Sequence, residues 1–275
     1  MRLRRRPNFT VICIAAATAA AATLLFTAEG CRRDAIQKPD ALALIRERGT
    51  LRVAVEGDYL PWNFHGDDGK LTGFDVELAR ILAEKLGVKA EFVETVWDSL
   101  LPGLADGRWD IVCNEVEPTD DREATYDFTV PYANIRTVVV ARSDRAADFP
   151  TPAALRGKTV AGSITSTYIA IARANGAYPV PTDTVEETMK LVKEGSADAM
   201  LDSNITFLDY KRVHPDTPLA VACENPDPSP VAIPMAKGEA TESLRNALDA
   251  AIEELREDGT LRELSVRFFG GDLTK

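Results

Sequence analysis

Short hydrophobic runs alternate with amphipathic segments along most of this chain. Residues 51–55 (LRVAV) form a strand-like run, and residues 75–86 place apolar side chains on one helical face, with Gly87 as the stop signal. Three further segments continue the alternation: strand-like 91–94, helix-like 99–107 and strand-like 110–114. Strands that alternate with helices in this way predict an α/β fold.

A second series with the same alternation follows an isolated β-branched run, TVVVA at residues 137–141, which has no strand partner close by in sequence. The strand-like and helix-like segments of this series are 158–163, 167–176, 178–181, 185–195, 198–203, 207–213 and 219–223. A proline-rich stretch at 226–230 interrupts it. Beyond that stretch the pattern predicts a strand at 231–237, a long amphipathic helix at 242–257 and a short helix ending at Phe268 and Phe269.

The order of the two series predicts two lobes. The middle series, residues 139–230, has extended runs on both sides that can cross between lobes. With two crossings, residues 40–138 and 231–275 build the first lobe, and residues 139–230 build the second. Such a topology produces a cleft whose two walls are able to hinge.

The composition is that of a globular protein with one large or two medium domains. Of the 275 residues, 45% are hydrophobic and 27% are charged. The formal net charge of −11 argues against nucleic acid as a partner, and most of these acids are expected to form a solvated surface. His65 and His214 stand apart from each other and from the cysteines, so we expect no metal ion and no cofactor.

The first 30 residues are typical of an export signal, because several arginines precede an uncharged apolar run at residues 9–26. Residues 28–31 (AEGC) resemble the lipobox of bacterial lipoproteins, which implies a lipidated Cys31 and a tether at 31–39. An uncleaved membrane anchor is the alternative, since about 18 apolar residues can just span a bilayer. In both cases we expect the folded part to lie outside the cytoplasm and to be anchored to the membrane.

Two cysteines remain once Cys13 is assigned to the signal and Cys31 to lipid. Cys113 and Cys223 each lie in an apolar strand-like run. Either they form a disulfide in an oxidising compartment, or they are two buried thiols.

Five segments, spread over most of the chain, carry a family resemblance. They are GFDVELARILAEKLG (73–87), WDSLLPGLADGRWDIV (97–112), TDDREATYDFTVPY (119–132), GSADAMLD (195–202) and DGTLRELSVRFFGGDLTK (258–275). Together they resemble the polar amino-acid class of periplasmic solute-binding proteins, which serve ABC importers. The resemblance implies a type II periplasmic-binding-protein fold, with a ligand cleft between two lobes joined by two hinge strands. It also implies a monomer that captures an amino-acid-like solute by hinged closure and delivers it to a permease.

Within that family, several stretches resemble cystine- or cysteine-binding members most. These stretches are Trp97-Asp98, Asn114, Tyr126-Asp127-Phe128 and the C-terminal Gly-Asp-Leu-Thr-Lys. The resemblance therefore implies a place for Asn114 in the ligand site.

A free amino acid presents a carboxylate and an ammonium on one carbon, so a specific site needs a cation on one wall and an anion on the other. By the resemblance, the cation is Arg122 and the anion is Asp202. Thr119, which begins the motif that ends at Arg122, is implied to bind the ligand as well. An arginine paired with a neighbouring acid is the alternative for Arg122. Helix capping is the alternative for Asp202, although Ser203 can serve as the cap instead.

Four further ligand-binding residues follow from the resemblance. Ser166 and Thr167 lie in a turn that receives the ligand carboxylate at a helix N-terminus, unless they only cap that helix. Tyr59 and Trp97 match aromatic residues that flank the ligand side chain. The aromatic residues assigned to the core are Trp62 and Phe64.

Three acids depart from the family pattern: Glu115, Glu117 and Glu56, the last at a position where binders of basic amino acids carry aspartate. We include Glu56 and Glu117 among the predicted ligand-binding residues. A carboxylate beside the arginine competes for it and repels an anionic ligand. Either Glu115 and Glu117 turn outward, or the ligand has an extra positive charge or lacks a free carboxylate.

The sequence leaves two alternatives to solute binding, an enzyme and a sensory module. The segments GDY (57–59) and RVHP (212–215) resemble cyclohexadienyl dehydratases, which act on prephenate or arogenate and share the fold. Those enzymes have a general-acid glutamate three residues after the second-lobe aspartate, where this chain has Ile205, so we predict no catalytic residue and no enzyme. A sensory module that reports solute to a separate signalling partner is the second alternative.

Overall fold

The computed structural model describes residues 39–275, and the first sheet in this part of the chain is built around strand β1 (Thr50–Val55). This strand pairs in parallel on both sides and is mostly buried, as expected for a central parallel strand. Strand β15 joins in antiparallel orientation from much later in the chain. In spatial order the strands are β5 (Lys89–Glu94), β1, β6 (Ile111–Val112), β15 (Pro234–Ala236) and β7 (Tyr126–Phe128).

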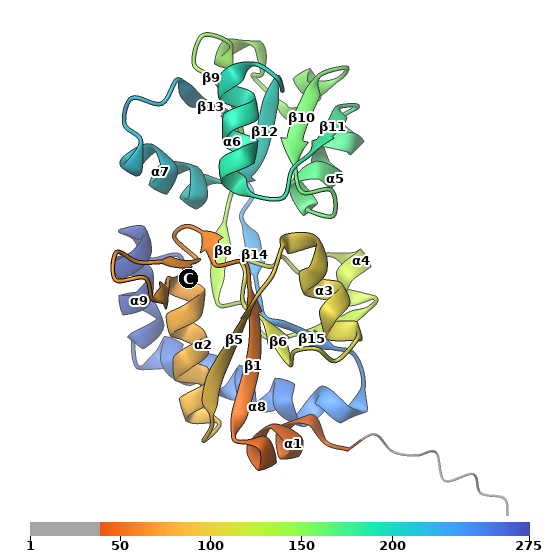
Figure 1. The fold of residues 1–275 in the computed structure, drawn as a ribbon, viewed down its shortest axis with the longest axis vertical. Helices are drawn as coiled ribbons and strands as arrows, with labels where there is room; N and C mark the ends of the chain where they lie inside the picture. Colours follow the sequence, from red (N-terminus) through yellow and green to blue (C-terminus); the bar gives the residue numbers. More distant parts are fainter. Residues whose placement is uncertain (1–38) are drawn as a thin grey trace, which may run out of the picture. The chain divides into compact units, whose positions relative to one another are not determined.

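Helices from both ends of the described chain pack against this first sheet, with α1, α2 and α8 gathered around it (Figure 1). The helices of this lobe are α1 (Ala41–Arg48), α2 (Phe74–Lys85), α3 (Trp97–Ala105), α4 (Asp120–Glu123), α8 (Glu239–Glu257) and α9 (Thr260–Phe269), the last of which packs on α2 and α8. A small separate sheet precedes α2 and consists of β2 (Asp58–Tyr59), β3 (Asn63–His65) and β4 (Leu71–Thr72).

The start of α2 depends on a glycine. Gly73 has φ 125°, and a Cβ atom there would lie 2.3 Å from the backbone oxygen of Trp62. Only glycine is compatible with both the backbone angle and the close approach. The helix therefore begins tightly against the β2–β3 segment, and its first turn carries Asp75 into the interior, where that residue is 0% exposed.

The second sheet is built from the middle of the chain. Its isolated β-branched strand β9 pairs in antiparallel orientation with β12 and β13, both far away in sequence. The strands in spatial order are β11 (Tyr178–Pro181), β10 (Thr159–Gly162), β12 (Ala199–Ser203), β9 (Thr137–Arg142) and β13 (Leu219–Glu224). The helices of this part are η1 (Ala146–Asp148), η2 (Pro152–Leu155), α5 (Thr167–Ala174), α6 (Val185–Glu194) and α7 (Asn204–Val213).

Two paired strands connect the sheets. Strand β8 (Ala133–Ile135) leads directly into β9, and β14 (Ser229–Val231) follows β13, and the two pair with each other in antiparallel orientation (Figure 1). Each sheet has its own buried hydrophobic clusters. The architecture is the two-lobed α/β arrangement that the sequence predicts.

Most predicted elements form close to their expected bounds, and two details differ. The strand expected at 231–237 is divided, because Val231 pairs in β14 while β15 begins at Pro234. Trp62 is fully buried against Phe74 and Phe269, as predicted, whereas Phe64 is only partly buried. Phe64 lies in the middle strand of the small β2–β3–β4 sheet and lines a surface pocket together with Leu60 and Phe268.

The two cysteines of the described region are both free thiols, which decides against a Cys113–Cys223 disulfide in this structure. Burial raises the pKa of the Cys113 thiol well above its usual range. Within residues 39–275, none of the helices has the length and apolar character needed to cross a membrane.

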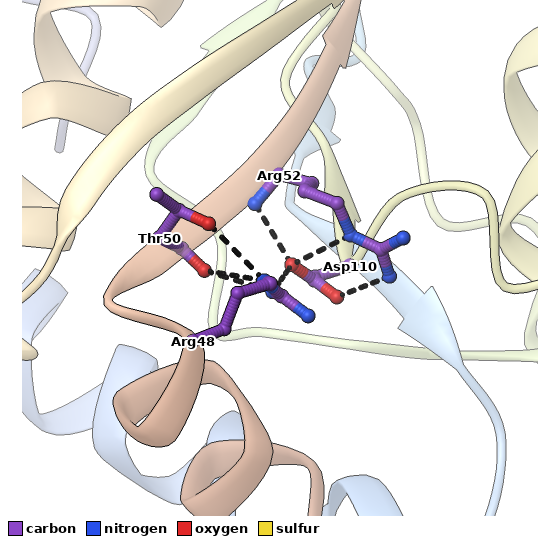
Figure 2. Close-up of polar contacts among 4 residues, drawn as sticks. All are labelled: Arg48, Thr50, Arg52 and Asp110. Carbon is purple, nitrogen blue, oxygen red and sulfur yellow. Dashed lines mark hydrogen bonds and ion pairs between the residues drawn. The ribbon is translucent and has the colours of Figure 1, made fainter.

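One acidic side chain in the first lobe has a complete set of partners. Asp110, just before β6, accepts hydrogen bonds from the Arg52 backbone N–H at 2.8 Å and from Arg52 Nη2 at 2.9 Å. Arg48 Nη2 binds the same carboxylate and also donates to the backbone oxygen of Thr50 (Figure 2). This ion-pair cluster joins the end of α1, the start of β1 and the loop before β6.

Candidate functional site

A cavity has walls from both lobes. It holds about 50 Å³ of free space, room for only a few water molecules and much less than a small-molecule pocket needs. The walls must therefore separate before an amino acid can enter. The lining residues are Glu56, Tyr59, Trp97, Glu115 and Glu117 from the first lobe, and Gly162, Ser163, Ser166, Thr167, Tyr168, Thr184, Val185, Thr188, Met200, Leu201 and Asp202 from the second.

The structure brings most of the predicted site residues to this cavity. Those on its walls are Glu56, Tyr59, Trp97, Glu117, Ser166, Thr167 and Asp202. Those set behind the walls are Asn114, Thr119 and Arg122. Cys31, the predicted lipidation site, lies outside the described residues.

A hydroxyl and two carboxyl groups meet directly across the cleft. Tyr59 Oη, from the β2 hairpin, lies 3.1 Å from Asp202 Oδ1 at the end of β12 and also within hydrogen-bond distance of Glu115 Oε2. Tyr168 Oη, near the start of α5, donates to Glu115 Oε1 at 3.3 Å. The cluster therefore joins the first lobe to the second through Glu115.

The orientation of Glu115 follows from its backbone. This residue has φ 50°, which is uncommon for any residue other than glycine and frequent at functional sites. Its N–H donates to Asp75 Oδ2 at 2.8 Å, and Asp75 Oδ1 accepts from the Tyr132 hydroxyl at 2.7 Å. The buried Asp75 thus stabilises the unusual turn, and Glu115, only 4% exposed, faces the cavity.

Asn114 acts behind the wall. It is 0% exposed, and its Oδ1 accepts from the Glu56 backbone N–H at 2.8 Å and from Asn63 Nδ2 at 2.9 Å. Its Nδ2 donates to Glu56 Oε2 at 2.7 Å. These contacts position Glu56 within the first lobe. Asn114 does not line the cavity, whereas the sequence predicts it in the ligand site.

Arg122 lies in the short helix α4, where Thr119 caps the helix by accepting the Arg122 N–H. Its Nη1 donates to the Glu117 backbone oxygen at 3.0 Å, and its guanidinium carbon lies 5.4 Å from the centroid of the Trp97 ring. The side chain is 8% exposed, and its Nη2 atom finds no hydrogen-bond partner among the described residues. Arg122 therefore lies behind Trp97 and Glu117 with one donor unused.

The hydroxyl groups on the second-lobe wall have different roles. Ser166 caps α5 by accepting the Ile169 N–H at 3.2 Å, the structural alternative that the sequence left open. Thr167 instead reaches across the cleft and hydrogen-bonds Glu117 Oε2. At the end of β12, Ser203 is the N-cap of α7, which leaves the Asp202 carboxylate facing the cavity, as predicted.

None of the acids on the wall forms an ion pair, and Arg122 next to Glu117 is the cation that the described residues bring near them. In residues 39–275, the ion pairs do not include any of the four lining carboxylates, Glu56, Glu115, Glu117 and Asp202. Burial raises the pKa of Glu56 and of Asp202 to about 7 and that of Glu115 well above its usual range. Burial likewise raises the pKa of Asp75, behind the wall, to about 7.

Sequence reasoning missed several wall residues and left the direction of Glu115 and Glu117 undecided. Tyr168 was assigned only to the start of a helix, and Thr184 and Thr188 were not singled out. The direction of Glu115 was open, because a left-handed backbone at a glutamate gives no signal in the sequence. The Glu-x-Glu pattern next to a buried strand was the available hint, and both glutamates face the cavity.

The chain matches the family model described as "Bacterial extracellular solute-binding proteins, family 3" over residues 51–271. It belongs to this family. A probable amino-acid ABC transporter-binding protein of Haemophilus influenzae is 38% identical over 84% of this chain and 89% of that protein. The L-cystine-binding protein TcyA of Bacillus subtilis is 34% identical over 88% of this chain and 90% of its own.

A solved structure supports the same relationship. An ancestral arginine-binding protein bound to arginine is 31% identical and superposes with a TM-score of 0.75, over 81% of this chain and 99% of the other. By their names, these relatives are an amino-acid ABC transporter-binding protein, an L-cystine-binding protein and an arginine-binding protein. Ile205, at the position where dehydratases carry their general acid, lies buried in the hydrophobic cluster of the first lobe.

Proposed function

We propose that this chain captures an amino acid or amino-acid-like solute outside the cytoplasm and delivers it to an ABC permease. The observation that carries the proposal is the cavity with ionisable walls from both lobes, above all the approach of Tyr59 to Asp202. The names of the relatives give amino acids, L-cystine and arginine as the ligands of those proteins.

Ligand binding favours closure only as far as the ligand contacts both lobes at once. We assign the ligand carboxylate to Arg122, whose unused Nη2 lies next to the wall residues Trp97 and Glu117. We assign the ligand ammonium to Asp202 on the opposite lobe. Tyr59 and Trp97 flank the side chain, and Thr167 changes partners when the walls separate, because its present partner Glu117 lies across the cleft.

The domain boundaries are part of the same proposal. Residues 40–138 with 231–275 form one lobe and residues 139–230 the other. The two sheets support this division, although β9 of the second sheet already begins at Thr137. The hinge is the β8–β14 pair. The protein works as a monomer, with no catalytic residue and no cofactor, and Cys31 carries the lipid that holds it at the membrane.

Binding is tested by thermal shift and titration calorimetry of the purified protein against a panel of free amino acids. A ligand that binds only the folded state raises the melting temperature. Replacement of Arg122 by alanine should remove the response, and Arg122→Lys should recover only part of it, because lysine lacks the bidentate fork. The matched control is Arg145→Ala, an exposed arginine that pairs with Asp148. Unchanged binding by Arg122→Ala would refute the assignment.

The membrane tether has a separate test. In cells that express the full chain, Cys31→Ala should move the protein from the membrane fraction to the soluble fraction. Wild-type protein that is recovered entirely in the soluble fraction would exclude lipidation at this residue and leave ligand binding untouched.

A further inference from the structure

The cavity has more negative charge than a neutral amino acid can balance. Four carboxylates line it, whereas the lining residues include no lysine, arginine or histidine. Arg122, behind the wall, can compensate only one of them, and a ligand ammonium can compensate one more. A ligand carboxylate then adds a further negative charge. A neutral zwitterion therefore leaves the closed site with buried acids that lack a counter-charge.

The contacts of Tyr59 are a second, independent sign of uncompensated negative charge in the cavity. A tyrosine hydroxyl has a single hydrogen to donate, yet Tyr59 Oη is within hydrogen-bond distance of both Glu115 and Asp202. Both contacts are hydrogen bonds at the same time only when one of the two carboxyl groups holds a proton and donates it to the hydroxyl oxygen. In this closed arrangement a proton occupies a place that a cationic group of a ligand can take.

The unused donor of Arg122 limits what kind of cation fits. A diamine without a carboxylate would leave Nη2 of Arg122 buried and unpaired, which costs free energy. A ligand that carries both a carboxylate and more than one positive charge satisfies the arginine and compensates one more wall acid than a neutral amino acid does.

We propose that the site selects amino acids with a positively charged side chain, and that Glu115, between Tyr59 and Tyr168, is the group that establishes this preference. The inference rests on the proposed function, because it concerns the ligand of the same cavity. It departs from the L-cystine-binding relatives, since it requires a net positive ligand. Arginine, ornithine and lysine are the free amino acids with this chemistry.

The decisive experiment compares ligands of nearly equal shape. Titration calorimetry of the full wild-type chain at about pH 8 measures L-arginine against L-citrulline, which replaces the guanidinium by a neutral urea group, and against L-cystine. We expect L-arginine to bind at least about tenfold more tightly than L-citrulline, the effect of one compensated charge in a partly desolvated site.

Each other outcome is informative. If L-citrulline or L-cystine binds as tightly as L-arginine, the inferred preference is wrong while the proposed function stands. If no amino acid binds, the proposed function fails as well.

A variant tests the role of Glu115. Glu115→Gln should reduce the ratio of arginine to citrulline affinity by about tenfold or more, mostly through weaker arginine binding. The matched control, Glu194→Gln at the exposed end of α6, should leave both affinities unchanged. A Glu115→Gln protein that keeps the wild-type ratio would overturn the assignment to Glu115. The wild-type comparison does not depend on how well this variant folds.

Discussion

Asp110, just before β6, and Glu115, three residues after its end, are acidic residues with opposite surroundings. Asp110 is bound by Arg48 and Arg52 and by a backbone N–H, all from the first lobe (Figure 2). Glu115 has the hydroxyls of Tyr59 and Tyr168 as partners and no cation. The first carboxylate is compensated within the chain, whereas the second leaves its counter-charge to be supplied by a proton or a ligand.

This difference separates an acid that stabilises the fold from acids that serve binding. A carboxylate that only holds elements together gains from permanent cationic partners. A carboxylate kept among neutral donors in a buried cavity destabilises the folded state when it is charged, and such a cost is retained where the charge has a function. The four predictions below test this contrast.

The largest effect is expected for Asp202→Asn. Loss of the ammonium partner should weaken amino-acid binding by about 2–5 kcal/mol, or roughly 30-fold to several thousandfold. Stability at pH 8 should not fall, because burial raises the pKa of Asp202 to about 7 and the charged form is costly to bury. Calorimetry and thermal melts measure the two quantities. Asp110→Asn is the matched control and should leave affinity unchanged, and an Asp202→Asn protein with wild-type affinity would contradict the contrast.

The second effect is a loss of stability with rising pH. Glu56, Asp75 and Asp202 have pKa values raised by burial to about 7, against about 4 in an unfolded chain. Their contribution is fully present below about pH 4 and is lost as pH rises through about 7.

Melting temperatures between about pH 5 and 8 measure this loss, and they should fall as the pH increases. The charged and titratable groups around the cluster are Glu56, Tyr59, Asp75, Glu115, Glu117, Arg122, Tyr168 and Asp202. Asp202→Asn should flatten the profile and Asp110→Asn should not. A melting temperature that rises across this range would show that these acids are not buried as described.

A third, smaller effect is expected for the residue that supports Glu115. Asp75→Ala removes the acceptor of the Glu115 N–H and of the Tyr132 hydroxyl, so we expect a loss of about 1–3 kcal/mol in the free energy of unfolding. Denaturant titration measures it. Tyr132→Phe removes only one of the two bonds and should cost less. If Asp75→Ala is as stable as wild type, Asp75 does not hold this turn.

The smallest effect is expected at the compensated acid. Asp110→Asn keeps the size of the side chain and one acceptor but loses the charge, so the free energy of unfolding should fall by about 1 kcal/mol. Ligand affinity and the pH profile should stay as in wild type. A change in affinity at this position would mean that Asp110 and Glu115 do not have separate roles.

Much of the secondary structure could be predicted from local patterns in the sequence. The spacing of apolar residues in 75–86 and the β-branched run at 137–141 predict α2 and β9, because helix and strand differ in their period of burial. The division of 231–237 between β14 and β15 was missed, since partner strands from distant segments decide where each pairing begins and ends.

The sequence predicted which residues belong to the candidate site better than it predicted where each of them lies in the folded chain. The sequence pointed to seven residues of the cavity wall, among them Tyr59, Thr167 and Asp202. It placed Asn114 in the ligand site, whereas the folded chain uses that amide to hold Glu56. It did not include Tyr168, which reaches Glu115 only because the two lobes meet.

By itself the sequence determined the alternation of strands and helices, the charged residues available to a site and the membership of a family of solute-binding proteins. The tertiary structure alone decided that Glu115 and Glu117 face inward, that Asp110 is compensated, and that Tyr59 lies between two acids from different lobes. The physical reason is that periodic burial depends on residues that are neighbours in the sequence. The electric field at a carboxylate depends instead on groups more than fifty residues away along the chain. Only the folded chain shows whether such a charge meets an arginine or a hydroxyl.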